Sequence, residues 1–452
     1  MLQQILAIAL NTFLESVRQP IYFVLLLTGG VMQIMNTLLS AYSMSFSDST
    51  EVSGDNKMLL DMGLATVFVI ATLLAAFIAT AVLSREIQDK TVLTVISKPV
   101  GRTTFILGKY IGALVAVLLG CVILLIFFQF ALRHEVMSTA KDHMDGPVVL
   151  FGSVAILLAF GFGIWGNFFY GWVFSSITVY AMAPLLFIAW LLMLIISKDW
   201  SIQPPHVSLK PQVMLASLLM LMAMPVLTAV ALVASTRLGQ VMTIMICAGV
   251  FVLGLLSNHM FGRGAFLNHP IAAVAEALPQ RDRDSNLSDA TDSWTIRLDQ
   301  PPKRSIHRGD ALYFGSSPNG LSLINPKMDE FEGDPGQDTD LDRSDAAKAI
   351  VVRSIDSAAL DEYTIVNSGS LALPRPIEEG DFVFLEPTNV NPVMVVAWGI
   401  TPNLQNFWLV DAITQKHDIP GKYVGLVAIY SLLQVTGLLS LAVILFQNRD
   451  VG

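Results

Sequence analysis

The sequence predicts an α-helical polytopic membrane protein, of about eight transmembrane helices, with an inserted β-rich extracytoplasmic domain. The chain of 452 residues is 54% hydrophobic and 14% charged, whereas charged residues make up about a quarter of an ordinary soluble domain. Its apolar residues gather in runs of about 20, the length of helix that crosses a bilayer core about 30 Å thick. Acidic residues concentrate elsewhere, because 24 of the 36 Asp and Glu lie within 259–422.

The first 19 residues predict an amphipathic helix at the membrane interface. The stretch lacks the basic start and small-residue cleavage site of a signal peptide, so we expect it to stay in the protein. Its apolar residues recur at helical spacing: Leu2, Ile5, Leu6, Ala9, Phe13 and Val17.

Residues 20–258 predict transmembrane helices one to seven, and residues 423–452 predict the last transmembrane helix with a short tail. The uncharged run 148–196 is too long for one crossing at about 1.5 Å per residue, and glycines interrupt it, so we divide it into two helices. Six further apolar windows each match one crossing: 21–39, 64–83, 110–132, 213–234, 241–261 and 423–446.

The distribution of Lys and Arg predicts that both termini are cytoplasmic. Five basic residues lie in the loop 85–109 between the second and third spans, and loops rich in Lys and Arg stay inside. With eight spans, residues 259–422 then lie outside the cytoplasm. The sequence therefore predicts a multi-pass protein of the inner or plasma membrane.

The region 259–422 predicts β-structure, with a re-entrant or interfacial segment near 391–408. Asn319-Gly320 is a strong turn signal, and we expect the fragment 285–387 to be soluble and rich in β-structure. The apolar segment near 391–408 is too short to cross the membrane. Strand-prone runs separated by Pro, Gly, Asp and Ser carry the β prediction: 294–298, 311–314, 321–324, 349–355, 363–366 and 381–385.

The sequence contains no recognisable motif for binding a nucleotide. Gly101 and Gly108 are separated by six residues rather than four, and Tyr110 replaces the hydroxyl of a phosphate-binding loop. Two groups could bind a cation, although neither has the spacing of a known site. The first would be a soft-metal group, and the second lies in the acidic loop 329–345: His134, Glu135, Met137, His143 and Met144; Asp338, Asp340, Asp342 and Asp345.

The order of residues in the loop between spans two and three is similar to that of a known type of segment. Residues 84–102 begin Ser-Arg-Glu and end Lys-Pro-Val-Gly-Arg, and Leu-Gly-Lys follows at 107–109. This order resembles the intracellular coupling segment of permeases of the type-2 ABC exporter family. The amphipathic start and the final span extend the resemblance, whereas an extra helical pair and the enlarged domain 259–422 depart from the usual six-span pattern.

The resemblance implies a permease subunit that moves a substrate by alternating access, driven by a separate cytoplasmic ABC ATPase that binds ATP and Mg. It implies a second permease copy, as a homodimer or heterodimer, and contact with membrane lipid. The matching positions assign docking on the ATPase to Glu86, Asp89 and Lys90. The matching positions also assign the turn into span three to Pro99 and Arg102. Leu93 and Ile96 offer an apolar face beside these charges, which suits a small buried anchor.

Two alternatives remain open from the residues themselves. The basic loop could follow from topology alone, with Lys and Arg facing lipid headgroups. The chain could also be a non-transporting anchor or sensor that displays its β domain to cell-envelope partners. An enzyme is the weakest hypothesis, because no catalytic dyad stands out, and the acidity of the outer domain argues against nucleic acid.

Overall fold

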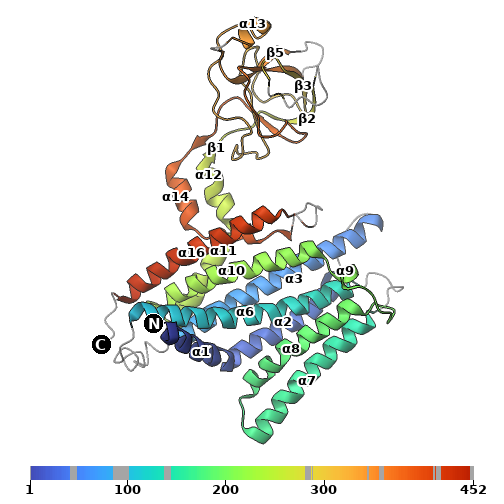
Figure 1. The fold of residues 1–452 in the computed structure, drawn as a ribbon, viewed down its shortest axis with the longest axis vertical. Helices are drawn as coiled ribbons and strands as arrows, with labels where there is room; N and C mark the ends of the chain where they lie inside the picture. Colours follow the sequence, from blue (N-terminus) through green and yellow to red (C-terminus); the bar gives the residue numbers. More distant parts are fainter. Residues whose placement is uncertain are drawn as a thin grey trace. The chain divides into compact units, whose positions relative to one another are not determined.

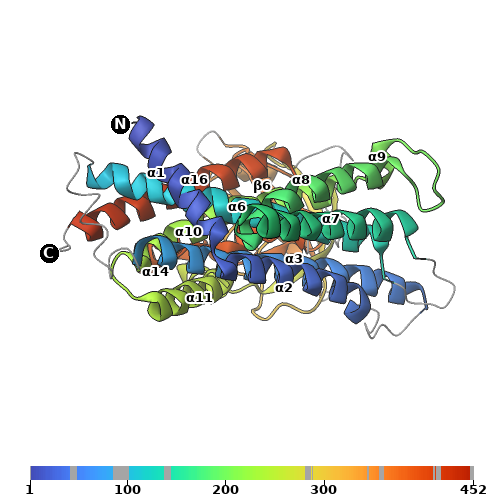
Figure 2. The ribbon, with the colours of Figure 1, turned by 90° about the horizontal axis from the view of Figure 1, so that it is seen from below.

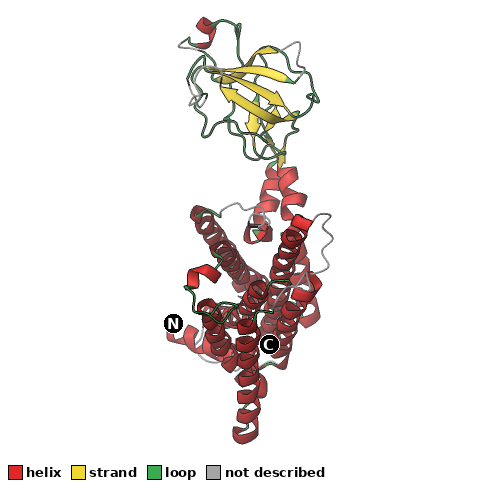
Figure 3. Ribbon diagram, turned by 90° about the vertical axis from the view of Figure 1, so that its right-hand side faces the viewer, coloured by secondary structure: helices red, strands yellow, loops and turns green. Residues whose placement is uncertain are grey.

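The structure, a computed structural model, describes residues 2–40, 48–84, 101–136, 144–279, 287, 289–343, 346–355, 361–410, 413 and 419–447. The chain divides into two compact units. Met1–Leu256 with Pro402–Gly452 forms the first, and Ser257–Thr401 forms the second. The first unit is helical in its described parts, and the second contains the strands (Figure 3).

The first unit is here called the membrane unit. Among the residues that the structure describes, eight helices are long and apolar enough to cross a bilayer, which confirms the predicted number. Hydropathy alone underestimates the length of the second helix, because this helix begins at Asp48 and its polar first turns precede the apolar run. The helices of this unit are shown in Figure 1: α1 (Leu2–Arg18), α2 (Pro20–Leu39), α3 (Asp48–Ala79) with the π-helix η2 (Thr80–Ser84), α6 (Arg102–His134), α7 (Gly146–Tyr170), α8 (Phe174–Ile195), α9 (Pro205–Ser208), α10 (Pro211–Ser235), α11 (Gln240–Ser257), η4 (Leu404–Phe407) and α16 (Gly421–Gln447).

The long uncharged run divides into α7 and α8 as predicted, and its local sequence explains where. Asp145 caps α7 by accepting a hydrogen bond from Val148 N. Gly171 ends the helix with a φ of +64°, a conformation that favours glycine. The two helices then pack closely, because a Cβ at Gly163 would meet Thr178 and the ring of Phe174.

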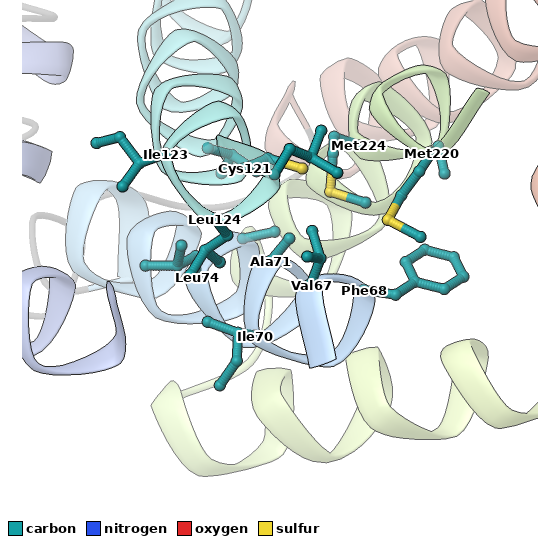
Figure 4. Close-up of a cluster of buried hydrophobic side chains, with 14 of the residues drawn as sticks. Val67, Phe68, Ile70, Ala71, Leu74, Cys121, Ile123, Leu124, Met220 and Met224 are labelled. Carbon is teal, nitrogen blue, oxygen red and sulfur yellow. The ribbon is translucent and has the colours of Figure 1, made fainter. Parts of the chain in front are cut away.

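The centre of the membrane unit is formed by α3, α6 and α10, whose apolar spans are the most buried of the eight. Figure 4 shows side chains of the three helices meeting in one cluster, in which Val67 and Leu74 of α3 lie near Leu124 of α6 and Met220 of α10. Helices α11 and α16 lie at the edges of the bundle in Figure 2 and α7 at its edge in Figure 1, and all three expose many Leu, Ile, Val and Phe side chains. Such outer faces suit lipid or a second membrane protein.

The second unit, here called the barrel unit, is built on an antiparallel six-stranded sheet with the order β4-β7-β2-β3-β6-β5. The two ends of this order are joined, because Leu312 N donates to Ile350 O and Val352 N donates to Asp310 O. The sheet therefore closes into a small barrel around a core that includes Trp294 and Phe314. The strands are β1 (Phe266–Leu267), β2 (Ala272–Pro279), β3 (Ser293–Leu298), β4 (Tyr313–Gly315), β5 (Ala349–Ile355), β6 (Glu362–Ser368), β7 (Phe382–Phe384) and β8 (Asn389–Val390).

The barrel unit matches most of the predicted strand positions. Gly320 has a φ of +69° in the predicted turn. The residues on the two sides of this turn form only one isolated bridge, between Gly315 and Leu323. The central strand β2 was not predicted. It places the start of the sheet ahead of residue 285, so the predicted fragment 285–387 lacks a strand that pairs on both sides.

The acidic loop contains a short helix, α13 (Asp338–Leu341). Its carboxylates have partners within the protein: Asp338 accepts a hydrogen bond from Arg353 at 2.9 Å, and Asp340 accepts one from Asp334 N at 3.0 Å. Among the described residues, no group of three His, Cys, Asp or Glu side chains could hold a metal ion.

The segment near 391–408 divides between the two units. In the barrel unit, α14 (Pro392–Ile400) pairs with η3 (Asn258–Gly262) and α12 (Arg263–Ala265), and Trp398 Nε1 donates to Asn258 Oδ1 at 3.0 Å. In the membrane unit, Leu404 and Phe407 are buried in the helical core. The observed boundary at Thr401 thus precedes the expected one at 422, because the apolar side chains after Thr401 pack against the helices.

Candidate functional site: the coupling end of the helical unit

The predicted coupling segment lies between η2 and α6, and the structure describes its two flanks. Glu86, Asp89, Lys90, Leu93, Ile96 and Pro99 lie outside the described residues. Arg102 is described, as the first residue of α6. The site is therefore built from the elements that hold these flanks, and we call this end of the membrane unit the coupling end.

The start of α6 is fastened to the end of α16. Arg102 Nη1 donates to the carbonyl oxygen of Gln447 at 2.6 Å, across 345 positions of sequence. One turn further on, the ring of Phe105 stacks on Phe446 with 5.7 Å between centroids. Lys109 is buried, and its Nζ lies 5.6 Å from the centroid of Phe105, a cation–π arrangement. These contacts join the helix after the coupling segment to the last helix of the chain.

The other side of α6 receives α1. A Cβ added at Gly108 would lie 2.7 Å from the Cβ of Ile8, and a Cβ at Gly112 would overlap the carbonyl oxygen of Ala9. Glycines four residues apart let two helix backbones approach closely in this way. Helix α1 thus buries one face, which includes Ile5 and Ala9, while other apolar side chains stay exposed: Leu2, Leu6 and Leu10.

The two apolar faces of α1 explain its amphipathic pattern better than a single membrane face does. The exposed face carries leucines at a spacing of four, as an interfacial helix needs. The buried face is more mixed, and Ser16 satisfies its hydroxyl by donating to Thr12 O at 2.7 Å. Helix α1 is therefore part of the packed membrane unit as well as a candidate membrane anchor.

A third set of contacts links the coupling end to α10. Tyr110 Oη donates to the carbonyl oxygen of Pro225 at 3.1 Å. Pro225 lies inside α10, where its ring removes one helical hydrogen bond and disturbs the regular helix. The helix ahead of the segment is irregular too, because α3 ends in the π-helix η2, and such widened turns often occur at functional sites.

The interior of the membrane unit is polar at few points. Gln33 of α2 donates to Gly63 O at 2.8 Å, and Tyr22 Oη donates to Ala116 O at 2.8 Å. Among the described residues of this unit, the buried charged residues are Lys109, near the start of α6, and Asp145, the N-cap of α7, whose partner Arg133 has a side chain only 9% exposed. A transporter driven from outside the membrane has no need of an intramembrane chain of ionisable groups.

Arg102 and Lys109 were singled out from the sequence, but the contact of the neighbouring Phe105 with Phe446 was not. No local pattern marks that contact, because it joins residues far apart in the chain. The docking of α1 was detectable, since Gly108 and Gly112 form a Gly-x-x-x-Gly motif.

These features define a multi-pass helical membrane protein with a separate β-barrel unit and a packed coupling end. Residues 57–239 match the family model described as ABC-2 family transporter protein. This part of the chain is therefore similar to the membrane domain of ABC-2-type permeases, and the match extends from span two through span six, across the predicted coupling segment. No curated protein and no solved structure matches the chain.

Proposed function

We propose that the chain is the permease subunit of an ABC exporter and is driven by a separate cytoplasmic ATPase. The observation that carries the proposal is that one ABC-2 family match contains both the segment 85–109 and the helices that flank it. ATP and Mg bind to the partner ATPase. Two permease copies assemble with two ATPase domains and move the substrate by alternating access.

The coupling end provides a way to transmit force. The ATPase docks on Glu86, Asp89 and Lys90, with Leu93 and Ile96 as the apolar anchor and Pro99 with Arg102 at the turn. Movement of this segment acts directly on α6. Because α6 is joined to α1 through Gly108 and Gly112, and to α16 through Arg102, three helices respond together.

The proposed orientation follows from charge. The segment 85–109, both termini and Arg237 lie in the cytoplasm, whereas the barrel unit lies outside. The barrel unit then acts on the far side from the ATPase, where it receives or releases the substrate or holds a cell-envelope partner.

The decisive experiment reverses charge in the coupling segment. Glu86→Lys with Lys90→Glu should abolish copurification of the ATPase, or at least uncouple its ATP hydrolysis, while the protein stays folded in the membrane. Arg237→Glu is the matched control, because Arg237 is exposed on the same predicted side but lies outside the segment. Normal pairing and coupling in the double variant would overturn the assignment of Glu86 and Lys90 as docking residues. If no ATPase copurifies even with the unaltered protein, the rival function, a membrane anchor for the barrel unit, is the better explanation.

A further inference from the structure

A cavity of about 190 Å³ opens at the end of the membrane unit opposite the coupling segment. Its walls come from the ends of α6 and α8 and the start of α10, together with the connection around α9. One water needs only about 10–15 Å³ of such space, so the cavity has room for a polyatomic ligand. Three cationic side chains line it: Arg133, Lys198 and Lys210.

Arg133 is the residue of this site that is buried and held in place by the protein. Its side chain is 9% exposed, and Nε lies 3.1 Å from Oδ2 of the fully buried Asp145. Its Nη2 donates to the carbonyl oxygen of Ile196. The remaining nitrogen, Nη1, is buried without a hydrogen-bond partner among the described residues. A buried guanidinium N–H normally has an acceptor, so this position calls for an oxygen ligand.

The charge balance of the cavity favours an anion. Lys198 pairs with Glu135 at 3.2 Å, and both side chains are about half exposed. Counting Arg133, Lys198 and Lys210 against Glu135 and Asp145 leaves one positive charge. Gln129 and Gln203 add amide groups, and Trp190 and Met214 add apolar wall.

The position of Arg133 along α6 indicates which class of anion the cavity binds. Arg133 follows Arg102 by 31 residues in one helix, which corresponds to about 46 Å at 1.5 Å per residue. A bilayer with its headgroups is about 40–45 Å thick. If Arg102 lies in one headgroup layer, Arg133 lies at the level of the phosphates in the other.

We propose that this cavity, between the ends of α6 and α8 and the start of α10, binds a phosphate-type oxyanion, with Arg133, Lys198 and Lys210 as its ligands. The phosphate belongs either to a lipid headgroup or to a free anion. The site does not depend on the proposed export function.

The test uses purified full-length protein in neutral detergent and follows the melting temperature during titration with inorganic phosphate, against chloride at equal ionic strength. Phosphate should stabilise the protein saturably. Lys198→Gln with Lys210→Gln should weaken apparent binding by at least about tenfold, since two charge-assisted contacts are lost. Lys303→Gln with Lys422→Gln removes the same charge from exposed positions outside the cavity and should leave binding unchanged.

A second variant separates binding from folding. Glu135→Gln removes the repelling carboxylate that lines the cavity and should tighten phosphate binding. Equal effects of phosphate and chloride, equal loss in the two double variants, or no gain with Glu135→Gln would each overturn the proposal.

The source of the phosphate is assigned by a lipid titration. A short-chain anionic phospholipid that binds at least about tenfold more tightly than inorganic phosphate identifies a headgroup site in contact with Trp190 and Met214. Equal affinities identify a site for the free anion. A short-chain zwitterionic lipid that binds as tightly as the anionic one would contradict the charge argument.

Discussion

Gly112 of α6 faces the carbonyl oxygen of Ala9 in α1 so closely that no side chain fits between them. This single contact ties the first helix of the chain to the helix that follows the coupling segment. It also gives the Gly-x-x-x-Gly motif of α6 a role inside one chain rather than between two chains.

Replacing Gly112 should therefore displace α1. We expect Gly112→Ala to destabilise the protein by about 1–3 kcal/mol, the usual cost of inserting a methyl group where backbone blocks it. The measurement is the midpoint of thermal unfolding in detergent. Gly437→Ala in α16 is the control, because open space surrounds that position, and its change should stay within about 1 kcal/mol. A normal midpoint for Gly112→Ala would mean that α1 is not packed as described.

The pair of Arg133 and Asp145 should matter far more than the neighbouring pair of Lys198 and Glu135. The first is almost fully buried and the second is about half exposed. Asp145→Asn keeps an oxygen to cap α7 but leaves Arg133 uncompensated, at a cost of about 3–5 kcal/mol. Glu135→Gln should cost less than about 1 kcal/mol. Thermal unfolding of both single variants decides the matter, and similar midpoints would contradict the burial of the first pair.

The isolated barrel should fold only when β2 is present. The fragment 266–390 contains every strand of the closed sheet, and Phe266 and Val390 pair where its ends meet. It should be soluble, rich in β-structure by circular dichroism, and cooperative in thermal unfolding. The fragment 285–387 lacks the strand between β3 and β7 and should be unfolded. Equal folding of the two fragments would show that β2 is dispensable.

Protease should reach the barrel unit from outside the cell. In sealed right-side-out vesicles, trypsin should cut at Arg343, beside the exposed loop that holds α13. The coupling segment, rich in Lys and Arg, should be cut only after the vesicles are opened. The reverse order of cleavage would invert the proposed topology.

The sequence predicted the elements whose local pattern agrees with their environment. β5 combines Ile350, Val351 and Val352 and was found with its observed limits. β2 was missed because its residues Ala272–Pro279 are half alanine, and alanine favours helices in isolation. Here the pairing of β2 with β3 and β7 decides the conformation, so tertiary structure overrides propensity.

The same contrast holds at the candidate sites. The coupling segment was predicted from consecutive residues, whereas the Arg133 cavity was not predicted. Lys198 and Lys210 follow Arg133 by 65 and 77 positions, and no local pattern shows that the three residues line one cavity. Such sites depend on how the helix ends assemble, and they become visible only in three dimensions.

Closure of the barrel restricts how the barrel unit can meet a partner. An open sheet offers unpaired backbone groups at its edges, and a partner chain can add a strand there. In this unit β5 instead pairs with the segment ahead of β4, through Ala311 and Val351, so both edges of the sheet order are used internally. Recognition by strand addition to this sheet is thereby disfavoured, and a binding partner would instead contact the side chains and loops on the barrel's surface.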